Sequence, residues 1–121
     1  MKVLLVDDSG TMRAIQKRIL MGLGITEIVE AGDGQMAIKT ATLEKPDLIM
    51  MDWNMPILSG IEALKKMKAD PALKSIPVIM VTSESEKSHI MEALSNGASN
   101  YVVKPFNADT IKEKLAPFTA K

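Results

Sequence analysis

Short unbroken apolar runs recur along the chain, separated by stretches in which apolar residues return every three or four positions. One such run, Leu48 to Met51, predicts a strand covered on both faces. Further strands are predicted over 2–6, 25–30, 76–81 and 99–103, and the glutamates of the run 25–30 suit a strand near a sheet edge. Five strands alternating with helices predict an α/β fold, with a parallel sheet covered by helices on both faces.

The helical stretches open at capping residues and close at glycine or proline. We predict one helix from Thr11 to Gly22 or Gly24 and a second over 34–43, capped by Asp33. A third helix begins at the cap Ser59 and runs through residue 68, a fourth covers 86–95, and a fifth begins at the cap Asn107. The apolar spacing predicts these inward-facing residues: Met12, Ile15, Ile19 and Leu23; Met36, Ala37, Ile38 and Ala41; Ile61, Leu64 and Met67; Ile111, Leu115 and Phe118. Arg13, Lys17 and Arg18 lie off the first of these faces.

Composition narrows the class of protein. The 121 residues predict one domain over 1–121, and 15 basic against 15 acidic residues argue against nucleic acid as a partner. The chain has no cysteine, so disulfides and thiolate chemistry are excluded. No apolar run is long enough for a signal peptide or a membrane span, so we expect a cytoplasmic protein without membrane insertion.

Polar residues stand where the predicted strands end. Asp7 and Asp8 follow the first strand, Asp52 the central one, Thr82 the fourth and Lys104 the fifth. The carboxyl ends of parallel strands share one edge of the sheet, where ligands usually bind. Three carboxylates there would raise each other's proton affinity unless a cation lay among them, and Mg²⁺ suits a sparse set of oxygen ligands.

A carboxylate beside a divalent cation, a lysine and a hydroxyl suits phosphoryl transfer. Asp52 would be the nucleophile, and the product an aspartyl phosphate. Lys104 would pair with a carboxylate before transfer and with a phosphoryl oxygen afterwards, and Thr82 would donate a hydrogen bond to the new group.

Over essentially its whole length the chain resembles the receiver domains of two-component response regulators. The resemblance rests on Asp7-Asp8, Asp52, Thr82 and Lys104-Pro105-Phe106, in the order and approximate spacing of that family. The stretch 52–56, Asp-Trp-Asn-Met-Pro, is most similar to the chemotaxis regulators that consist of a receiver alone. The resemblance implies a flavodoxin-like (βα)5 fold with strand order 2-1-3-4-5, and a phosphoryl group donated to Asp52 by a phosphohistidine.

The resemblance also implies a metal-ligand set. Asp8 would bind Mg²⁺ directly, Asp7 would bind it through water, and Asp52 and the backbone carbonyl of Asn54 would complete the protein ligands. The bond between Lys104 and Pro105 is cis in the family.

The family further implies a switch and an output face. Movement of Thr82 toward the phosphoryl group would let the Tyr101 ring turn inward and alter the face of the fourth helix, fifth strand and fifth helix. Ile90, Tyr101 and Lys114 are our predicted output residues. Implied partners are a sensor histidine kinase of the CheA type, a flagellar motor switch protein or another protein target, and a phosphatase. The protein would be a monomer with no enzyme activity beyond self-phosphorylation and self-dephosphorylation.

Other interpretations of the same residues stay open. A magnesium phosphohydrolase would act through the same intermediate, but it needs a second acid two residues after the nucleophile, where this chain has Asn54. A flavin-binding domain would need a Ser/Thr-rich loop after the first strand. A phosphate sink and a receiver cut from a longer regulator remain alternatives. Trp53 is expected at the rim of the site, and His89 on a helix surface, facing solvent or a partner.

Overall fold

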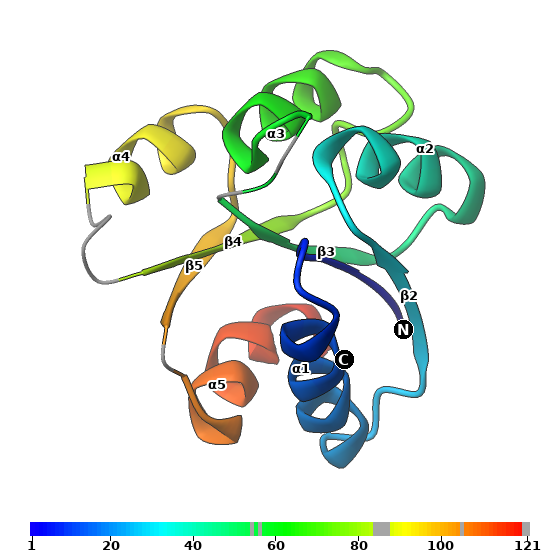
Figure 1. Cartoon of the computed structure of the whole chain (residues 1–121), viewed down its shortest axis with the longest axis vertical. Coiled ribbons are helices and arrows are strands. Elements are labelled where there is room, and N and C mark those ends of the chain that lie inside the picture. Colours follow the sequence, from blue (N-terminus) through cyan, green and yellow to red (C-terminus); the bar gives the residue numbers. More distant parts are fainter. Residues whose placement is uncertain (54, 56, 84–87, 105, 120–121) are drawn as a thin grey trace.

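The computed structural model describes residues 1–53, 55, 57–83, 88–104 and 106–119 (Figure 1). Strands and helices alternate along the chain: β1 (Lys2–Val6), α1 (Gly10–Gly22), β2 (Glu27–Ala31), α2 (Gly34–Glu44), β3 (Leu48–Asp52), α3 (Gly60–Ala69), β4 (Val78–Ser83), α4 (Ser88–Ser95), β5 (Asn100–Lys104) and α5 (Ala108–Thr119). The strands form one parallel five-stranded sheet in the order β2-β1-β3-β4-β5. This arrangement confirms the predicted flavodoxin-like (βα)5 fold.

Helices cover both faces of the sheet. Figure 1 shows α1 and α5 on one face and α2, α3 and α4 on the other. Successive strand side chains point to opposite faces, so β1 sends Val3 and Leu5 into the core beneath α1 and α5, and Leu4 and Val6 into the core beneath the other three helices. Both faces of β1 are therefore buried, which explains its unbroken apolar sequence.

The central strand β3 is buried along its whole length, as its sequence predicts. It pairs with β1 and β4, with Met51 opposite Val6 on one side and Asp52 opposite Val81 on the other. This register carries the ends of β1, β3 and β4 to the same edge of the sheet. Among the described residues, no helix has the length and apolarity that a bilayer crossing requires.

Several strand boundaries lie later than predicted. β2 begins at Glu27 instead of Ile25, and β4 runs from Val78 to Ser83, so that Thr82 lies inside this strand and not beyond it. Lys104 is likewise the last residue of β5 and not a loop residue. β4 and β5 end later because their pairing continues past the last apolar side chain of each strand. β2 begins later because the N–H of Ile25 donates to the Leu20 carbonyl at the end of α1. The predicted start of α4 at 86–87 lies outside the described residues.

Two predicted inward faces need correction. Ile15 of α1 is 47% exposed and Met36 of α2 is 45% exposed, whereas Gln16 and Leu20 are buried. Each residue turns a helix by about 100°, so the buried stripe through 16 and 20 leaves Ile15 at its flank. The faces predicted for α3 and for the centre of α5 are confirmed, since Ile61, Leu64, Met67, Ile111 and Leu115 are buried.

Candidate functional site

Strand alternation assembles a polar cluster at the carboxyl edge of the sheet. Asp52 is the last residue of β3 and continues the row of Leu48 and Met50 toward the α1 and α5 face. Asp7 follows β1 in the same register as Val3 and Leu5, and Lys104 continues the row of Val102 in β5. The apolar rows on three strands thus end in charged residues at one edge.

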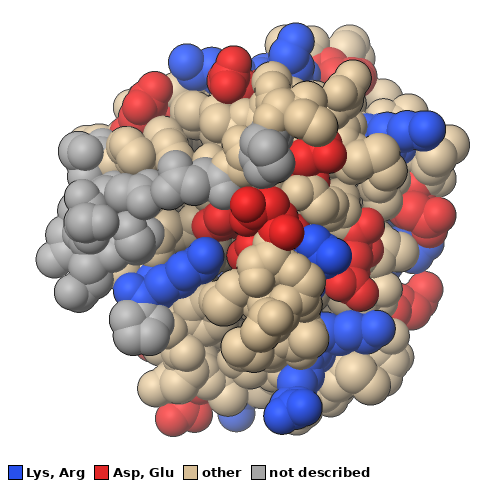
Figure 2. All heavy atoms as spheres, viewed as in Figure 1, with Lys and Arg blue, Asp and Glu red and all other residues tan. Residues whose placement is uncertain are grey.

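The charged groups of this cluster lie close together. One carboxylate oxygen from each of Asp7, Asp8 and Asp52 lies within 4.8 Å of the others. The Lys104 Nζ is 3.0 Å from Oδ1 of Asp52 and 3.6 Å from Oδ2 of Asp7. Asp7 and Asp52 are buried, and Asp8 is exposed to solvent. In Figure 2 acidic atoms gather at the centre of this face with basic side chains on either side.

Burial controls the protonation of Asp52 more than charge repulsion does. Burial raises the pKa of Asp52 from 3.8 to about 6, the hydrogen bond and charge of Lys104 oppose the rise, and the charges of Asp7 and Asp8 add to it. The neighbouring carboxylates therefore raise the pKa of Asp52, as predicted, but they contribute less than burial does. Burial alone would lower the pKa of Lys104, but its hydrogen bond to Asp52 and the charges of Asp52 and Asp7 hold that pKa above its usual value.

The acidic cluster fits a divalent cation. Oδ2 of Asp7 is buried and accepts no hydrogen bond within the described part of the chain, and the Lys104 ammonium lies 3.6 Å away. Such an oxygen keeps lone pairs free for a cation, and exposed Asp8 leaves a side open to solvent. The three carboxylates can therefore hold a metal ion. The predicted Asn54 carbonyl ligand, and the bond between Lys104 and Pro105, lie outside the described residues.

A close contact between the end of β3 and α3 depends on glycine. The backbone N–H of Gly60 donates to the Trp53 carbonyl at 2.9 Å, and a Cβ at Gly60 would come within 2.1 Å of the Asp52 carbonyl oxygen. Ser59 and Glu62 form a capping box that starts α3 at this point. The start of α3 therefore packs directly against the backbone of Asp52.

Thr82 and Tyr101 share one face of the sheet. Thr82 is buried and continues the row of Val78 and Met80. Tyr101 lies opposite Met80 in the pairing of β4 with β5, and it is half-buried. Neighbouring strands in register point paired residues to the same side, so the two predicted switch residues lie on the α4 side of the sheet.

The predicted output residues come from three elements. The Lys114 Nζ of α5 lies 4.6 Å from the centre of the Tyr101 ring of β5, a cation–π contact. Ile90 of α4 is half-buried. Next to it in α4, Met91 is 70% exposed, a residue that was not among the predicted output residues.

The predicted position of Trp53 at the rim is wrong. Trp53 is only 7% exposed, and its ring stacks on His89 of α4 with centroids 4.0 Å apart and an interplanar angle of 12°. Alternation along β3 contained the signal, because Trp53 follows Ile49 and Met51 on the face that α3 and α4 cover. The stack joins α4 to the residue next to Asp52.

A second surface feature lies away from the acidic cluster. An open cleft of about 820 Å³ is lined by residues of α2, α3 and the segment before α3, among them Met36, Ile57 and Lys66. None of the clustered acids lines it, so it is not part of this site.

The fold and the acidic edge define a class of protein. The family model of the response regulator receiver domain matches residues 3–116, and the chain belongs to that family. The prediction from the sequence is thereby confirmed. Membership agrees with the expectation that the protein is no conventional enzyme.

Within this family, the chain is similar in sequence to chemotaxis proteins. The chain is 46% identical over 115 residues to the chemotaxis protein CheY of Pseudomonas aeruginosa, covering 95% of this chain and 93% of the relative. It is also 46% identical over 115 residues to the chemotaxis protein CheY-3 of Vibrio cholerae, covering 95% of this chain and 88% of the relative.

Solved structures agree in fold. The chemotaxis response regulator CheY4 of Vibrio cholerae superimposes with a TM-score of 0.87 at 34% identity, covering 97% of both chains. The receiver domain of a sensor histidine kinase from Pseudomonas aeruginosa, solved with a magnesium ion coordinated in its active-site cleft, has a TM-score of 0.88 at 25% identity, covering 99% of this chain and 98% of that one.

Proposed function

We propose that this protein is a CheY-like chemotaxis response regulator, a phosphorylation switch in which Asp52 accepts a phosphoryl group with the help of Mg²⁺. The observation that carries the proposal is the convergence of three carboxylates within 4.8 Å, with the Lys104 ammonium 3.0 Å from Asp52. The magnesium ion reported in a related receiver domain supports the choice of metal. Asp7, Asp8, Asp52 and the Asn54 carbonyl would hold the ion.

The proposed chemistry is one phosphoryl transfer. An Oδ atom of Asp52 attacks the phosphorus of a phosphohistidine, the P–N bond breaks, and the imidazole leaves with the electron pair. A bound Mg²⁺ would neutralise charge on the phosphoryl oxygens. Lys104 already contacts Asp52, so it needs little movement to pair with a phosphoryl oxygen, and Thr82 can donate its hydroxyl to the same group. Hydrolysis of the acyl phosphate by water resets the switch.

The proposed output is a population shift at the face formed by α4, β5 and α5. A phosphoryl group that interacts better with one position of Thr82 favours the conformation in which Tyr101 turns inward. Ile90, Tyr101 and Lys114 would then present a different surface to the target. Their placement on three adjoining elements supports this assignment.

The relatives suggest the partners. We propose a sensor histidine kinase of the CheA type as phosphoryl donor, a flagellar motor switch protein as target, and a phosphatase that shortens the signal. We further propose that residues 1–121 form one receiver domain, acting as a monomer in the cytoplasm. Family membership favours this switch over a magnesium phosphohydrolase or a flavin-binding domain.

The test is phosphorylation by a small acyl phosphate. The protein should incorporate one phosphoryl group per chain when Mg²⁺ is present, and intact-mass spectrometry would count it. Asp52→Asn should abolish incorporation. Asp47→Asn, directly before the opposite end of the same strand, should leave incorporation unchanged. Incorporation that survives Asp52→Asn would refute the assignment of the acceptor.

Trp53 emission gives a second measure of the same site. Trp53 follows Asp52 in the sequence, and its ring stacks on His89. Trp53 emission should therefore change once on addition of Mg²⁺ and again on addition of beryllofluoride, a phosphoryl analogue. A partner titration should then perturb α4, β5 and α5. Perturbation confined to α2 and α3 would mean that the output face is elsewhere.

A further inference from the structure

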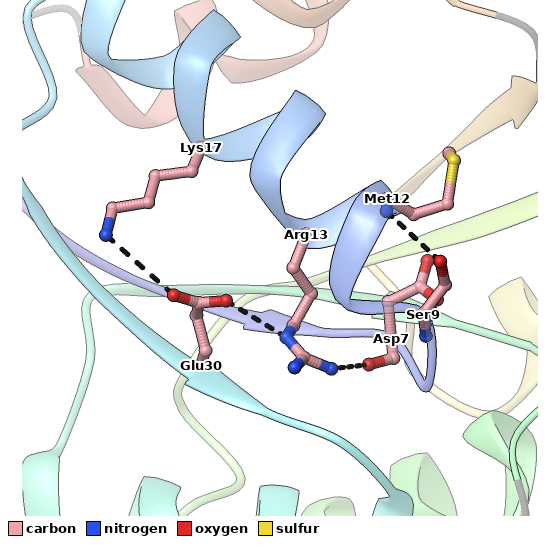
Figure 3. A network of polar contacts seen from close by, with 6 residues as sticks. All are labelled: Asp7, Ser9, Met12, Arg13, Lys17 and Glu30. Atoms are coloured by element: carbon pink, nitrogen blue, oxygen red, sulfur yellow. Dashed lines mark hydrogen bonds and ion pairs between the residues drawn. The ribbon is translucent and has the colours of Figure 1, made fainter.

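An arginine outside the acidic cluster holds the loop that carries two of its acids. Arg13 of α1 donates through Nη1 to the backbone carbonyl of Asp7, and through Nε to Oε1 of Glu30 in β2 at 3.0 Å (Figure 3). Lys17, one turn further along α1, lies 3.8 Å from the other oxygen of Glu30. The network thus ties the loop after β1 to the neighbouring strand.

The guanidinium lies between the start of α1 and the loop after β2. A Cβ added at Gly10 would lie 3.7 Å from Nη2 of Arg13, and one at Gly32 would lie 3.6 Å from Nη1. Both would be ordinary contacts for an added Cβ, so the planar group lies beside Gly10, the first residue of α1, and beside Gly32, which follows β2. The N–H of Asp7 also donates to the Ala31 carbonyl at 3.2 Å, so both backbone polar groups of Asp7 are bound.

The Asp7 side chain is restrained from the other direction. Its Oδ1 accepts the N–H of Ser9 at 2.9 Å, while Ser9 caps α1 by accepting the N–H of Met12. With the main chain held by Arg13 and the side chain held by Ser9, Oδ2 stays aimed at the cluster without a hydrogen bond of its own among the described residues. Removing Arg13 would release the Asp7 carbonyl and leave the N–H bond to Ala31 and the side-chain bond to Ser9 in place.

Arg13 has two opposed effects on a cation bound at the cluster. Its positive charge repels the cation, and this repulsion is reduced because Glu30 pairs with the guanidinium. Its hydrogen bond to Asp7 favours the cation by keeping the ligand in place, since a flexible ligand loses entropy on binding. The two effects have opposite signs, so a single substitution can show which is larger.

We propose that Arg13 is a positioning residue for the divalent cation, and that Glu30 orients Arg13 for this role. The proposal rests on the proposed function, because it requires a cation at Asp7, Asp8 and Asp52. Two hydrogen-bonding directions of one rigid guanidinium are used, one to the carbonyl and one to the carboxylate. A lysine could not reproduce this geometry.

The test is the affinity for Mn²⁺, an ion that accepts the same oxygen ligands and whose free form is counted by electron paramagnetic resonance. Arg13→Gln should weaken Mn²⁺ binding about tenfold, and Arg13→Lys should weaken it by a similar factor although the charge is kept. The matched control is Lys17→Gln, which removes a positive charge beside Glu30 without touching Asp7. It should bind Mn²⁺ as tightly as the wild type or slightly more tightly.

The Mn²⁺ binding results distinguish a failure of the positioning role of Arg13 from a failure of the proposed metal site. Wild-type protein that binds no Mn²⁺ would refute the proposed metal site itself. Wild-type binding with unchanged or tighter binding in Arg13→Gln would refute the positioning role alone. If Arg13→Gln does not fold, as judged by circular dichroism in EDTA, Glu30→Ala decides: it keeps Arg13 but removes the carboxylate that accepts its Nε–H, and unchanged Mn²⁺ affinity in that variant would overturn the proposal.

Discussion

Asp52→Asn should make the metal-free protein more stable at neutral pH, although it removes the proposed acceptor. The side chain of Asp52 is buried, and folding raises its pKa from 3.8 to about 6. A pKa difference of about 1 between the folded and unfolded states corresponds to about 1.4 kcal/mol, so after a reduction for solvent screening at the edge of the sheet, keeping this carboxylate charged in the folded state costs about 2 kcal/mol. Asparagine has nearly the same shape and no charge, so the substitution should recover about that amount.

The stability gained by Asp52→Asn should decrease as the pH falls. Above about pH 6 Asp52 is ionised in both the folded and unfolded states, and the full cost of the buried charge is present. As the pH falls from 6 toward 4, the folded state takes up a proton before the unfolded state does, and the cost disappears. The advantage of Asp52→Asn should therefore be largest at pH 7.5 and shrink toward zero near pH 4.

The assay is urea unfolding in EDTA, followed by circular dichroism at pH 7.5, 6 and 4.5. Glu113→Gln removes an exposed carboxylate outside the cluster and should change the free energy of unfolding by no more than a few tenths of a kcal/mol. Added Mg²⁺ should stabilise the wild type by binding its folded state and so narrow the difference from Asp52→Asn. A variant no more stable than the wild type at pH 7.5 in EDTA would refute the argument from burial.

Two further substitutions test the contacts around Asp52. Lys104→Met should lower the free energy of unfolding in EDTA at pH 7.5 by about 1–3 kcal/mol, because it leaves buried carboxylates unpaired. Added Mg²⁺ should restore most of this loss. The control is Lys112→Met at an exposed position, and an equal loss of stability there would contradict this reasoning. Gly60→Ala should destabilise the protein by at least about 2 kcal/mol in urea unfolding, because its Cβ would approach the Asp52 carbonyl to 2.1 Å. Gly22→Ala, where a Cβ meets nothing within 4 Å, should be neutral or stabilising, and a similar loss in both alanine variants would contradict the steric argument.

The fold followed from the sequence because its signals are local. Unbroken apolar runs, caps at Asp33 and Ser59, and a left-handed glycine at Gly97 all mark elements from a few neighbouring residues. Parallel strands must then bring their carboxyl ends to one edge. The meeting of Asp7, Asp8 and Asp52 was therefore predictable from position along the chain. The strand order came only from the resemblance to a family.

Other features depended on contacts between distant segments. Which residues of α1 are buried depends on how the helix rotates against the sheet, so Ile15 was wrongly assigned to the core while Gln16 was overlooked. The stack of Trp53 on His89 joins residues 36 positions apart, and the contact of Arg13 with Glu30 joins a helix to the next strand. Hydrophobic periodicity along one element contains no information about such pairs.

The sequence by itself determined that four of the five strands end in a set of acids, a hydroxyl and a lysine, since residue type and position along the chain suffice for that. Only the tertiary structure decided how those groups affect one another. It is the depth of Asp52 in the fold, more than the charge of its acidic neighbours, that raises its pKa to about 6. Burial is a property of the whole packed chain, because it depends on every element that excludes water from one carboxylate.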